Sequence, residues 1–407
     1  MSEQTLSRRR FLAVAGLGAA AALGACGISG ASTGLLAPTA TPNPSPAAPG
    51  PYQVGEVILG EDDVALYDAL SQFMTLGGYP GFPSNFLVDD NRCADGTLVG
   101  PQLPPNIHAA VYYPSAAGPG TPIPPLPVAT RDPRISITNP LSIARGPFPV
   151  LLYAHAYRDP LGSACGGAHP STSDFTSVAD MLGHVASYGC VVVVPDLSWI
   201  PGGFTTTTFD YYKYGVVLRA QVLMRYYDHL MSLNSRRFAQ QLDLSRLIVV
   251  GHSTGGPAAV EAARLLSFDI QFQSLSYGLL APIPGVLYGA KSNLLVLKGG
   301  NDTQQGADPM AAYAGGGPPK TLVTIPGANH FGYSDICPAN NHCVGVINDT
   351  NGDISRPLQQ LAGAAYLAAL VRYYARSDAT ALPYLNGAKQ VEGLEAIPGI
   401  QVQTQGI

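Results

Sequence analysis

A serine placed between glycines is the first residue in this 407-residue chain whose setting suggests chemistry. Ser253 is the middle residue of a G-x-S-x-G pattern, 251–255 (GHSTG). Four apolar residues, 247–250, lead directly into the pattern, and small residues suited to a helix follow it. A strand, a sharp turn and a helix in this order form a nucleophile elbow, which presents the serine hydroxyl at the edge of a sheet. We therefore predict that Ser253 is a nucleophile; the alternative is a tight turn with a solvated serine.

A base and an acid must accompany such a serine, because its hydroxyl is a weak nucleophile until a base removes the proton. His330 is the predicted base, since it lies in a glycine-containing loop directly after the β-rich run 321–325. Asp302 follows the apolar run 294–297 and is the predicted acid, which would orient the imidazole and stabilise its charged form. Strands of an open α/β sheet present functional residues at their carboxyl ends, so we expect these side chains to meet there. Asp308 is the alternative acid, and a solvated loop carboxylate is the alternative role for either aspartate.

Acyl transfer also requires N–H donors for the negative charge that develops on the substrate oxygen. The backbone N–H of Thr254, the residue after the serine, is one predicted donor. The backbone N–H of Tyr157, in the loop after the apolar run 148–154, is the other. Tyr157 could instead only line the cleft. The single tryptophan, Trp199, lies in an aromatic-rich loop that forms either a substrate-pocket wall or part of the core.

Apolar β-rich runs alternate with amphipathic stretches from about residue 105 onward, as in βαβ units around a mostly parallel sheet. Strands are predicted at 106–113, 148–154, 191–194, 247–250, 274–280, 294–297 and 321–325. Helices are predicted at 62–73, 174–188, 215–233, 257–266 and 357–375. The predicted class is therefore α/β, with a central sheet flanked by helices. Residues 103–380 form the predicted catalytic domain, between an N-terminal extension at 52–102 and a C-terminal tail at 381–407.

The first residues have the composition of an export signal. In residues 1–25, three consecutive arginines precede an apolar stretch that is too short to span a bilayer, which is typical of a twin-arginine signal peptide. The run 23–26 (LGAC) resembles the lipobox of bacterial lipoproteins, which implies cleavage before Cys26 and lipid attachment to its sulfur. Ordinary signal cleavage nearby is the alternative. Residues 26–51, rich in Pro, Ser and Thr, are predicted to be an extended tether.

Composition excludes some partners. Charged residues make up only 12% of the chain, its formal net charge is −5, and no stripe of Lys or Arg appears after residue 10. Nucleic acid is therefore not an expected partner, because binding its backbone needs concentrated cations. Apolar residues make up 46%, enough for a large core, while 46 Gly and 36 Pro indicate many loops.

Six cysteines are present, and an exported chain can keep disulfides. Cys337 and Cys343 flank a short polar loop and are the first predicted pair. Cys190 lies in a buried-strand pattern and is predicted to be an inert core thiol. Cys93 and Cys165 remain as a second pair by elimination. No C-x-x-C spacing supports a zinc cluster, and we expect no metal site.

These motifs, taken together, resemble one branch of the α/β-hydrolase superfamily. The branch includes dienelactone-hydrolase-like proteins, chlorophyllases, platelet-activating-factor acetylhydrolases and cutinase-like polyester hydrolases. The segments that carry the resemblance, which covers about residues 103–378, are 149–157, 190–196, 251–256, 301–302 and 327–330. It implies an α/β-hydrolase fold and a cofactor-independent serine esterase with a triad of Ser253, His330 and Asp302. Relatives have glycine where Ala156 stands in the oxyanion loop.

The resemblance also bears on the substrate. Polyester hydrolases commonly have Met after the nucleophile and an aromatic residue after an Ala-Pro pair, where this chain has Thr254 and Ile283. Ile283 is thus a candidate pocket residue, and a polyester substrate is not favoured.

The sequence as a whole predicts an exported serine hydrolase that cleaves carboxylic esters through an acyl-enzyme. Short to medium acyl or aryl esters are expected, because no hydrophobic lid helix is evident. The expected partners are small or polymeric ester substrates, with the membrane contacted only through a lipid on Cys26, at the outer face of a bacterial cell membrane. Three alternatives remain open: a polyester hydrolase, an acyltransferase or peptidase on the same fold, and a ligand-binding lipoprotein without catalysis.

Overall fold

The structure, a computed structural model, describes about three fifths of the chain. The described residues are 44–59, 108–115, 143–144, 146–156, 175–197, 200, 209–236, 238–268, 270–282, 292–303, 308–343 and 349–407. They belong to one compact unit, Asn43–Ile407. The predicted signal peptide, the lipidation site and the predicted helix at 62–73 lie outside the described residues.

Nine strands of the described residues pair into one sheet, in the order β1-β2-β4-β3-β5-β6-β7-β8-β9. They are β1 (Gln53–Leu59), β2 (Ala109–Ser115), β3 (Phe148–Ala154), β4 (Val191–Pro195), β5 (Leu242–His252), β6 (Ser274–Leu280), β7 (Leu294–Gly299), β8 (Lys320–Ile325) and β9 (Gln401–Gln405). The neighbours from β4 through β8 are parallel, whereas β1, β2 and β9 join antiparallel at the two sides. The predicted α/β class with a mostly parallel sheet is therefore confirmed.

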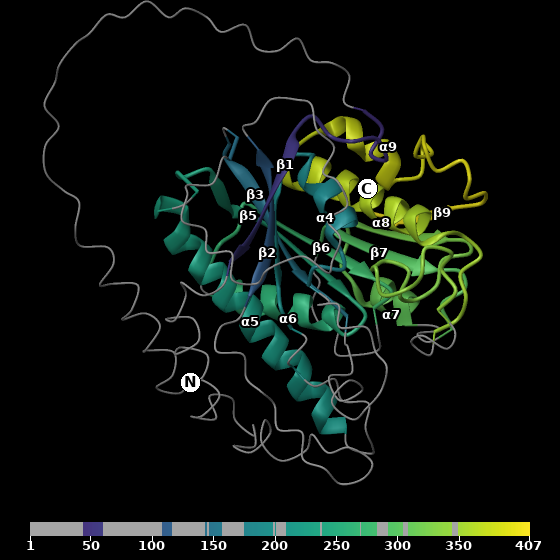
Figure 1. Ribbon diagram of the computed structural model, residues 1–407, viewed down its shortest axis with the longest axis horizontal. Helices are drawn as coiled ribbons and strands as arrows, with labels where there is room; N and C mark the ends of the chain where they lie inside the picture. Colours follow the sequence, from purple (N-terminus) through teal and green to yellow (C-terminus); the bar gives the residue numbers. More distant parts are fainter. Residues whose placement is uncertain are drawn as a thin grey trace, which may run out of the picture. The chain divides into compact units, whose positions relative to one another are not determined.

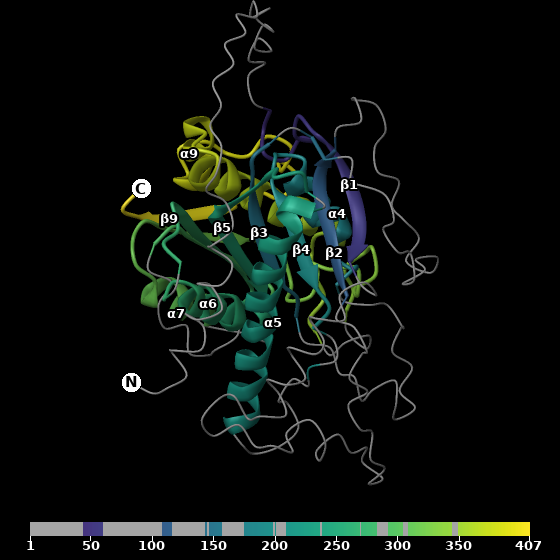
Figure 2. The ribbon, with the colours of Figure 1, turned by 90° about the vertical axis from the view of Figure 1, so that its left-hand side faces the viewer.

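Helices cover both faces of this sheet (Figures 1 and 2). They are α4 (Ala179–Ala186), α5 (Phe209–Arg236), α6 (Gly255–Leu266), α7 (Asp308–Gly315), α8 (Arg356–Leu370), which continues as a π-helical turn (Val371–Ala375), and α9 (Leu382–Leu385). Residues of α5, α6 and α7 belong to one core cluster, and residues of α4, α8 and α9 belong to the other. In Figure 1, α6 and α7 lie below the sheet and α8 and α9 lie above it. None of the helices in the described ranges combines the length and apolarity needed to cross a bilayer.

Continuous apolar strands explain the two-sided burial. Side chains of a strand alternate between its faces, so a strand covered on both faces must be apolar throughout. In β3, Val150 and Leu152 pack with α5 and α6 in one core cluster, while Leu151 and Tyr153 pack with α4 and α8 in the other. All seven residues of β3 are buried.

Two edge strands, β1 and β9, are not predicted from the sequence. β9 lies in the segment predicted as a tail and reads Gln-Val-Gln-Thr-Gln, with most of its residues exposed. It pairs with β8 from Lys320↔Gln405 to Thr324↔Gln401, so main-chain bonds to an open sheet edge, and not an apolar face, hold it. β1 lies in the predicted N-terminal extension and pairs with β2 along its full length.

The first described residues are attached to the helical layer that contains α4. The hydroxyl oxygen of Tyr188 lies 2.6 Å from the carbonyl oxygens of both Ser45 and Ala48, between which its single proton is shared. The buried guanidinium of Arg372 donates to the carbonyl of Pro44 at 3.0 Å. The end of the segment predicted as a tether is thus bound to the domain from residue 44 onward.

Candidate active site

Ser253 lies on a sharp turn between β5, which ends at His252, and α6, which begins at Gly255. Its φ is +53°, a left-handed conformation that is rare for a residue with a side chain. The N–H of Ser253 donates to the carbonyl of Leu280 at the end of β6, at 3.0 Å, and its carbonyl accepts from Gly256 at 3.0 Å. Such strain persists only where the surroundings enforce it, and it commonly marks a functional residue. The strand, turn and helix predicted around Ser253 are therefore present.

The two glycines of the motif are required by close approach of main chain. A Cβ on Gly251 would lie 2.1 Å from the carbonyl oxygen of Gly255, and a Cβ on Gly255 would lie 2.0 Å from that of Ala154. Both contacts are with backbone, which cannot turn aside as a flexible side chain can. Their small size brings the start of α6 against the end of β3, at the point where the connections from β3 and β5 leave the sheet in opposite directions. Open α/β sheets bind ligands at such a point.

Three predicted side chains meet at this edge of the sheet. His330 Nε2 lies 2.9 Å from Ser253 Oγ, and His330 Nδ1 lies 3.0 Å from Asp302 Oδ2. Since a carboxylate can only accept, Nδ1 carries the proton and Nε2 accepts from the serine hydroxyl. The side chains of His330 and Asp302 are each 1% exposed, so their interaction is little screened by water.

The loops that carry the acid and the base lie side by side because β7 and β8 are parallel neighbours. The N–H of Gly300 donates to Ile325 and that of Asn301 to Ala328, at 2.9 and 2.8 Å. Asp302 is the carboxylate that bonds His330. The alternative acid, Asp308, is the first residue of α7. Its pKa is raised, mainly by burial and to a smaller extent by the negative charge of Asp302.

His252 supports the base from the side of the elbow. Its Nε2 lies 2.8 Å from the carbonyl of His330, to which it must donate, and its ring packs against those of His330, Phe331 and Tyr333. Burial, and secondarily the nearby His330, lower the pKa of His252 to about 3. His252 is therefore neutral at physiological pH, consistent with a structural role.

The loop after β3, where one of the two oxyanion donors is expected, is held by His155. Its Nε2 accepts the N–H of Leu197 at 2.8 Å, so the proton lies on Nδ1, which donates to the carbonyl of Ala156 at 2.8 Å. The buried guanidinium of Arg219 on α5 donates to the carbonyl of His155 at 3.4 Å and to that of Ile200 at 3.2 Å. The start of the oxyanion loop is thereby fixed to the end of β4 and to α5.

The predicted donors and pocket residues divide between described and undescribed parts of the chain. Thr254 is described: it is the N-cap of α6, where backbone N–H groups and the helix dipole favour negative charge. The predicted residues outside the described ranges are Tyr157, Trp199, Ile283, Cys93, Cys165 and Cys26. A second G-x-S-x-G pattern, at 30–34, also lies outside them.

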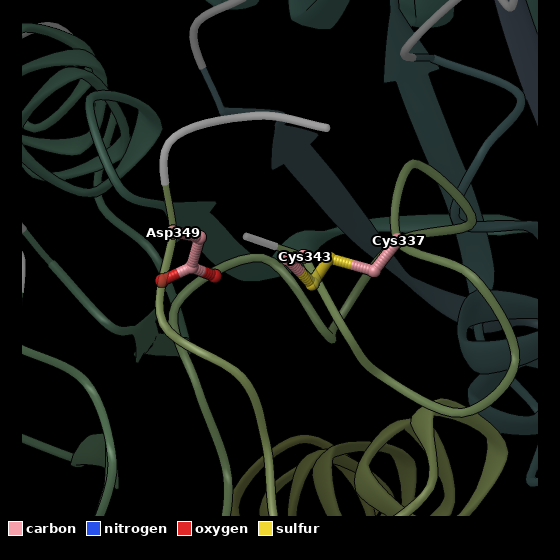
Figure 3. Close-up of side chains that lie close together, drawn as sticks. All are labelled: Cys337, Cys343 and Asp349. Carbon is pink, nitrogen blue, oxygen red and sulfur yellow. A yellow bond between two sulfur atoms is a disulfide. The ribbon is translucent and has the colours of Figure 1, made fainter. Parts of the chain in front are cut away.

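The predicted disulfide between Cys337 and Cys343 is confirmed, with a Cα–Cα distance of 5.3 Å. Cys190 is a buried free thiol, also as predicted. Among the described residues, one group of potential metal ligands lies close enough together to hold an ion, namely Cys337, Cys343 and Asp349, whose ligand atoms are within 4.8 Å of one another (Figure 3). Because the two sulfurs are bonded to each other, they offer no thiolate, and a carboxylate alone remains.

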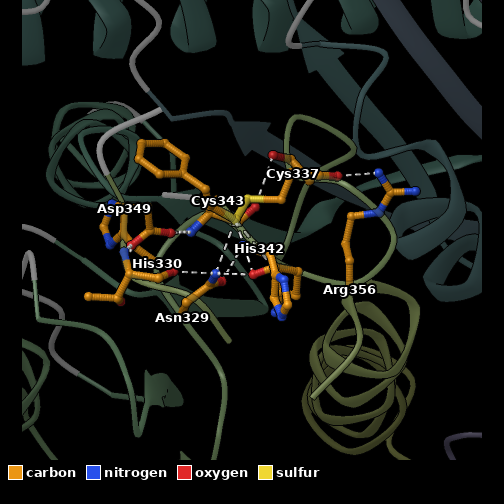
Figure 4. The surroundings of a disulfide bond; sticks show 12 residues. Asn329, His330, Cys337, His342, Cys343, Asp349 and Arg356 are labelled. Carbon is orange, nitrogen blue, oxygen red and sulfur yellow. Dashed lines mark hydrogen bonds between the residues drawn. A yellow bond between two sulfur atoms is a disulfide. The ribbon is translucent and has the colours of Figure 1, made fainter. Parts of the chain in front are cut away.

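A buried amide network holds the loop that carries His330 (Figure 4). The side chain of Gln359 on α8 accepts the N–H of Asn329 at 3.1 Å and donates to its carbonyl at 2.8 Å. Asn341 Nδ2 donates to Gln359 at 2.8 Å, and Asn329 Nδ2 donates to Cys343 Sγ at 3.1 Å. The disulfide and the base thus share one polar network.

Sequence reasoning missed this network and one further carboxylate, Asp349, which is buried and accepts the N–H of Phe331 at 2.9 Å. The pKa of Asp349 lies above its ordinary value, because burial disfavours the charged carboxylate. The hydrogen bond from Phe331 and the charge of His330 oppose this effect in part. The available signal was the predicted Cys337–Cys343 pair, which fixes the chain after His330 close to the site.

No protein-family model matches this chain, and no curated protein matches it.

Proposed function

We propose that the protein is a serine hydrolase that cleaves carboxylic esters through an acyl-enzyme, on an α/β-hydrolase fold. The observation that carries the proposal is that His330 bridges the hydroxyl of Ser253 and the carboxylate of Asp302, while Ser253 has a strained positive φ. The sheet order, the elbow after β5 and the acid and base after β7 and β8 support the fold assignment.

In this mechanism His330 Nε2 takes the proton of Ser253 as its oxygen attacks the ester carbonyl carbon. Asp302 accepts from His330 Nδ1 and stabilises the imidazolium in a buried setting. The imidazolium then gives its proton to the departing alcohol, which leaves an acyl group on Ser253. Water, deprotonated by His330, then attacks the acyl carbon. The bond between this carbon and Ser253 Oγ breaks, the carboxylic acid is released, and the imidazolium returns its proton to Ser253 Oγ.

The negative charge on the tetrahedral oxygen requires fixed N–H donors. We assign one of them to the backbone of Thr254, at the positive end of α6. The second is assigned to the backbone of Tyr157. The fixed position of His155 supports this assignment, because it orients the start of that loop.

The proposal includes export and anchoring. The signal-like residues 1–25 and the lipobox-like Cys26 motivate it, and the disulfide between Cys337 and Cys343 fits an oxidising compartment. Expression of the full chain in cells fed a labelled fatty acid tests the anchor. The label should appear in the wild type and be lost in Cys26→Ser.

Hydrolysis of p-nitrophenyl esters of increasing acyl length tests the activity. The wild type should turn over short to medium esters, and Ser253→Ala should lose this turnover. Ser267→Ala is the matched control, because Ser267 lies at the other end of α6 and its hydroxyl bonds a backbone carbonyl at 2.6 Å. Turnover that survives Ser253→Ala would remove the proposal. Transfer of the acyl group to an added alcohol in preference to water would instead indicate an acyltransferase.

A further inference from the structure

The chain segment 349–351 touches the base loop on both sides of His330. Asp349 Oδ2 accepts the N–H of Phe331 at 2.9 Å, and the carbonyl of Thr350 accepts from Asn329 Nδ2 at 2.9 Å. Phe331 and Asn329 are the two neighbours of His330 in sequence. The two sequence neighbours of the proposed base are therefore held by consecutive residues, Phe331 through its backbone N–H and Asn329 through its side-chain amide.

The same segment also touches the acid loop. The hydroxyl of Thr350 donates to the carbonyl of Asn301 at 2.5 Å, and the carbonyl of Asn351 accepts from Asn301 Nδ2 at 3.4 Å. Asn301 directly precedes Asp302. Segment 349–351 thus connects the loop of the acid with the loop of the base through four hydrogen bonds.

Burial and a local hydrogen bond also hold Asp349 in place. Asp349 is only 4% exposed, and its other carboxylate oxygen accepts the N–H of Thr350 at 2.7 Å. The carboxylate lies within 4.8 Å of the sulfur of Cys343, in the cluster around the disulfide that Figure 4 shows beside His330. Asp349 is the buried member of the segment, Thr350 is half-buried, and hydrogen bonds hold each of their side chains. Such side chains can transmit position, because they have few alternative rotamers.

We propose that Asp349 and Thr350 are positioning residues, and that segment 349–351 is a latch that fixes the acid loop relative to the base loop. The latch sets the distance between Asp302 and His330. Its consequence for catalysis rests on the proposed function, whereas its effect on that distance does not. Asp349 additionally places a second negative charge near the imidazole, where it would favour the imidazolium formed during acyl transfer.

The chain offers a matched pair of threonines for the test. Thr350→Val removes the hydroxyl that bonds Asn301 but keeps the shape, and Thr350→Ser keeps the hydroxyl. Thr321→Val is the control, because Thr321 is a buried threonine whose hydroxyl also donates to a backbone carbonyl, that of Leu385 at 3.0 Å. It lies near the amino end of β8, away from His330.

Two readouts are combined. For ester hydrolysis, Thr350→Val should lower kcat about tenfold with KM unchanged, because one hydrogen bond that aligns the triad is lost. Thr350→Ser should restore most of kcat, and Thr321→Val should leave it unchanged. By NMR of the resting protein, the Nδ1–H proton of His330, identified by its absence in His330→Gln, should shift or broaden in Thr350→Val but not in the control.

A wild-type kcat and an unshifted Nδ1–H signal in Thr350→Val would overturn the latch, as would equal losses in Thr350→Val and Thr321→Val. If the wild type hydrolyses no ester, the proposed function fails and the NMR signal alone decides the latch. Asp349→Asn provides a second variant in case Thr350→Val does not fold. It keeps an acceptor for Phe331 without the charge and should lower kcat about threefold or more. An unchanged kcat in Asp349→Asn would show that the negative charge of Asp349 does not contribute to catalysis.

Discussion

Gly255→Ala is the most direct test of why the elbow needs its glycines. The added Cβ would lie 2.0 Å from the carbonyl oxygen of Ala154, 2.6 Å from its carbon and 2.9 Å from the carbonyl oxygen of His155. Real Cβ atoms essentially never come within 3.0 Å of another group, so α6 and the end of β3 must separate by at least about 1 Å.

This displacement sets the expected changes in the free energy of unfolding and in kcat. Forcing an extra group into packed backbone costs about 1–3 kcal/mol. The preference of helix interiors for Ala offsets little of this cost, because Gly255 is the first residue of α6. We therefore expect a loss of about 1–3 kcal/mol in the free energy of unfolding. A shift of about 1 Å between the hydroxyl of Ser253 and the oxyanion loop should lower kcat on the order of 100-fold.

Urea unfolding and p-nitrophenyl ester kinetics measure the two effects. Gly315→Ala is the matched control, because Gly315 ends α7 and a Cβ there would have no neighbour within 4 Å. It should be as stable as the wild type or up to about 1 kcal/mol more stable, with full activity. A Gly255→Ala protein with wild-type stability and kcat would refute the close-approach argument.

Three further outcomes are expected. Asp302→Asn should lower kcat by about 10⁴-fold, with KM little changed, because it leaves His330 with the wrong tautomer; a loss below tenfold in ester kinetics would contradict this. Cys337→Ser with Cys343→Ser opens a loop of sequence separation 6 and should lower the free energy of unfolding by about 2 kcal/mol, and a reducing agent should bring the wild type to the same value in urea melts. His252 has a folded pKa of about 3 against about 6.5 unfolded, so its contribution to stability is complete above about pH 6.5 and falls by about 1.4 kcal/mol per pH unit below it; urea melts of His252→Gln between pH 7 and 5 should show a shallower slope, and equal slopes would exclude this origin.

Local sequence predicts the parts of the site that follow apolar strands. Ser253, Asp302 and His330 each come directly after a run that must be a buried strand, and parallel strands bring their carboxyl ends to one edge. The glycines that border the serine add a second local signal, because close approach of backbone requires them at 251 and 255. For these residues the order along the chain and the strand pattern are sufficient.

Other features depend on tertiary contacts that leave no periodic signal. Asp349 and Thr350 follow no predicted strand, and their partners Phe331 and Asn301 become neighbours only after the sheet has formed. Strand β9 has no apolar pattern and is held by the edge of β8. Helix boundaries also differ, since the predicted helix 174–188 begins only at Ala179, after a turn at 175–178, and the Val178 that precedes it makes no side-chain cap.

Covalent trapping tests the central claim most directly. The full chain is treated with a fluorophosphonate, which phosphonylates an activated serine, and the modified peptide is identified by mass spectrometry. A single adduct on Ser253, lost in His330→Gln, is the predicted result. Two results would contradict the assignment of Ser253 as the nucleophile. One is an adduct on a different residue, and the other is a wild-type protein that hydrolyses esters but whose Ser253 does not react with the fluorophosphonate.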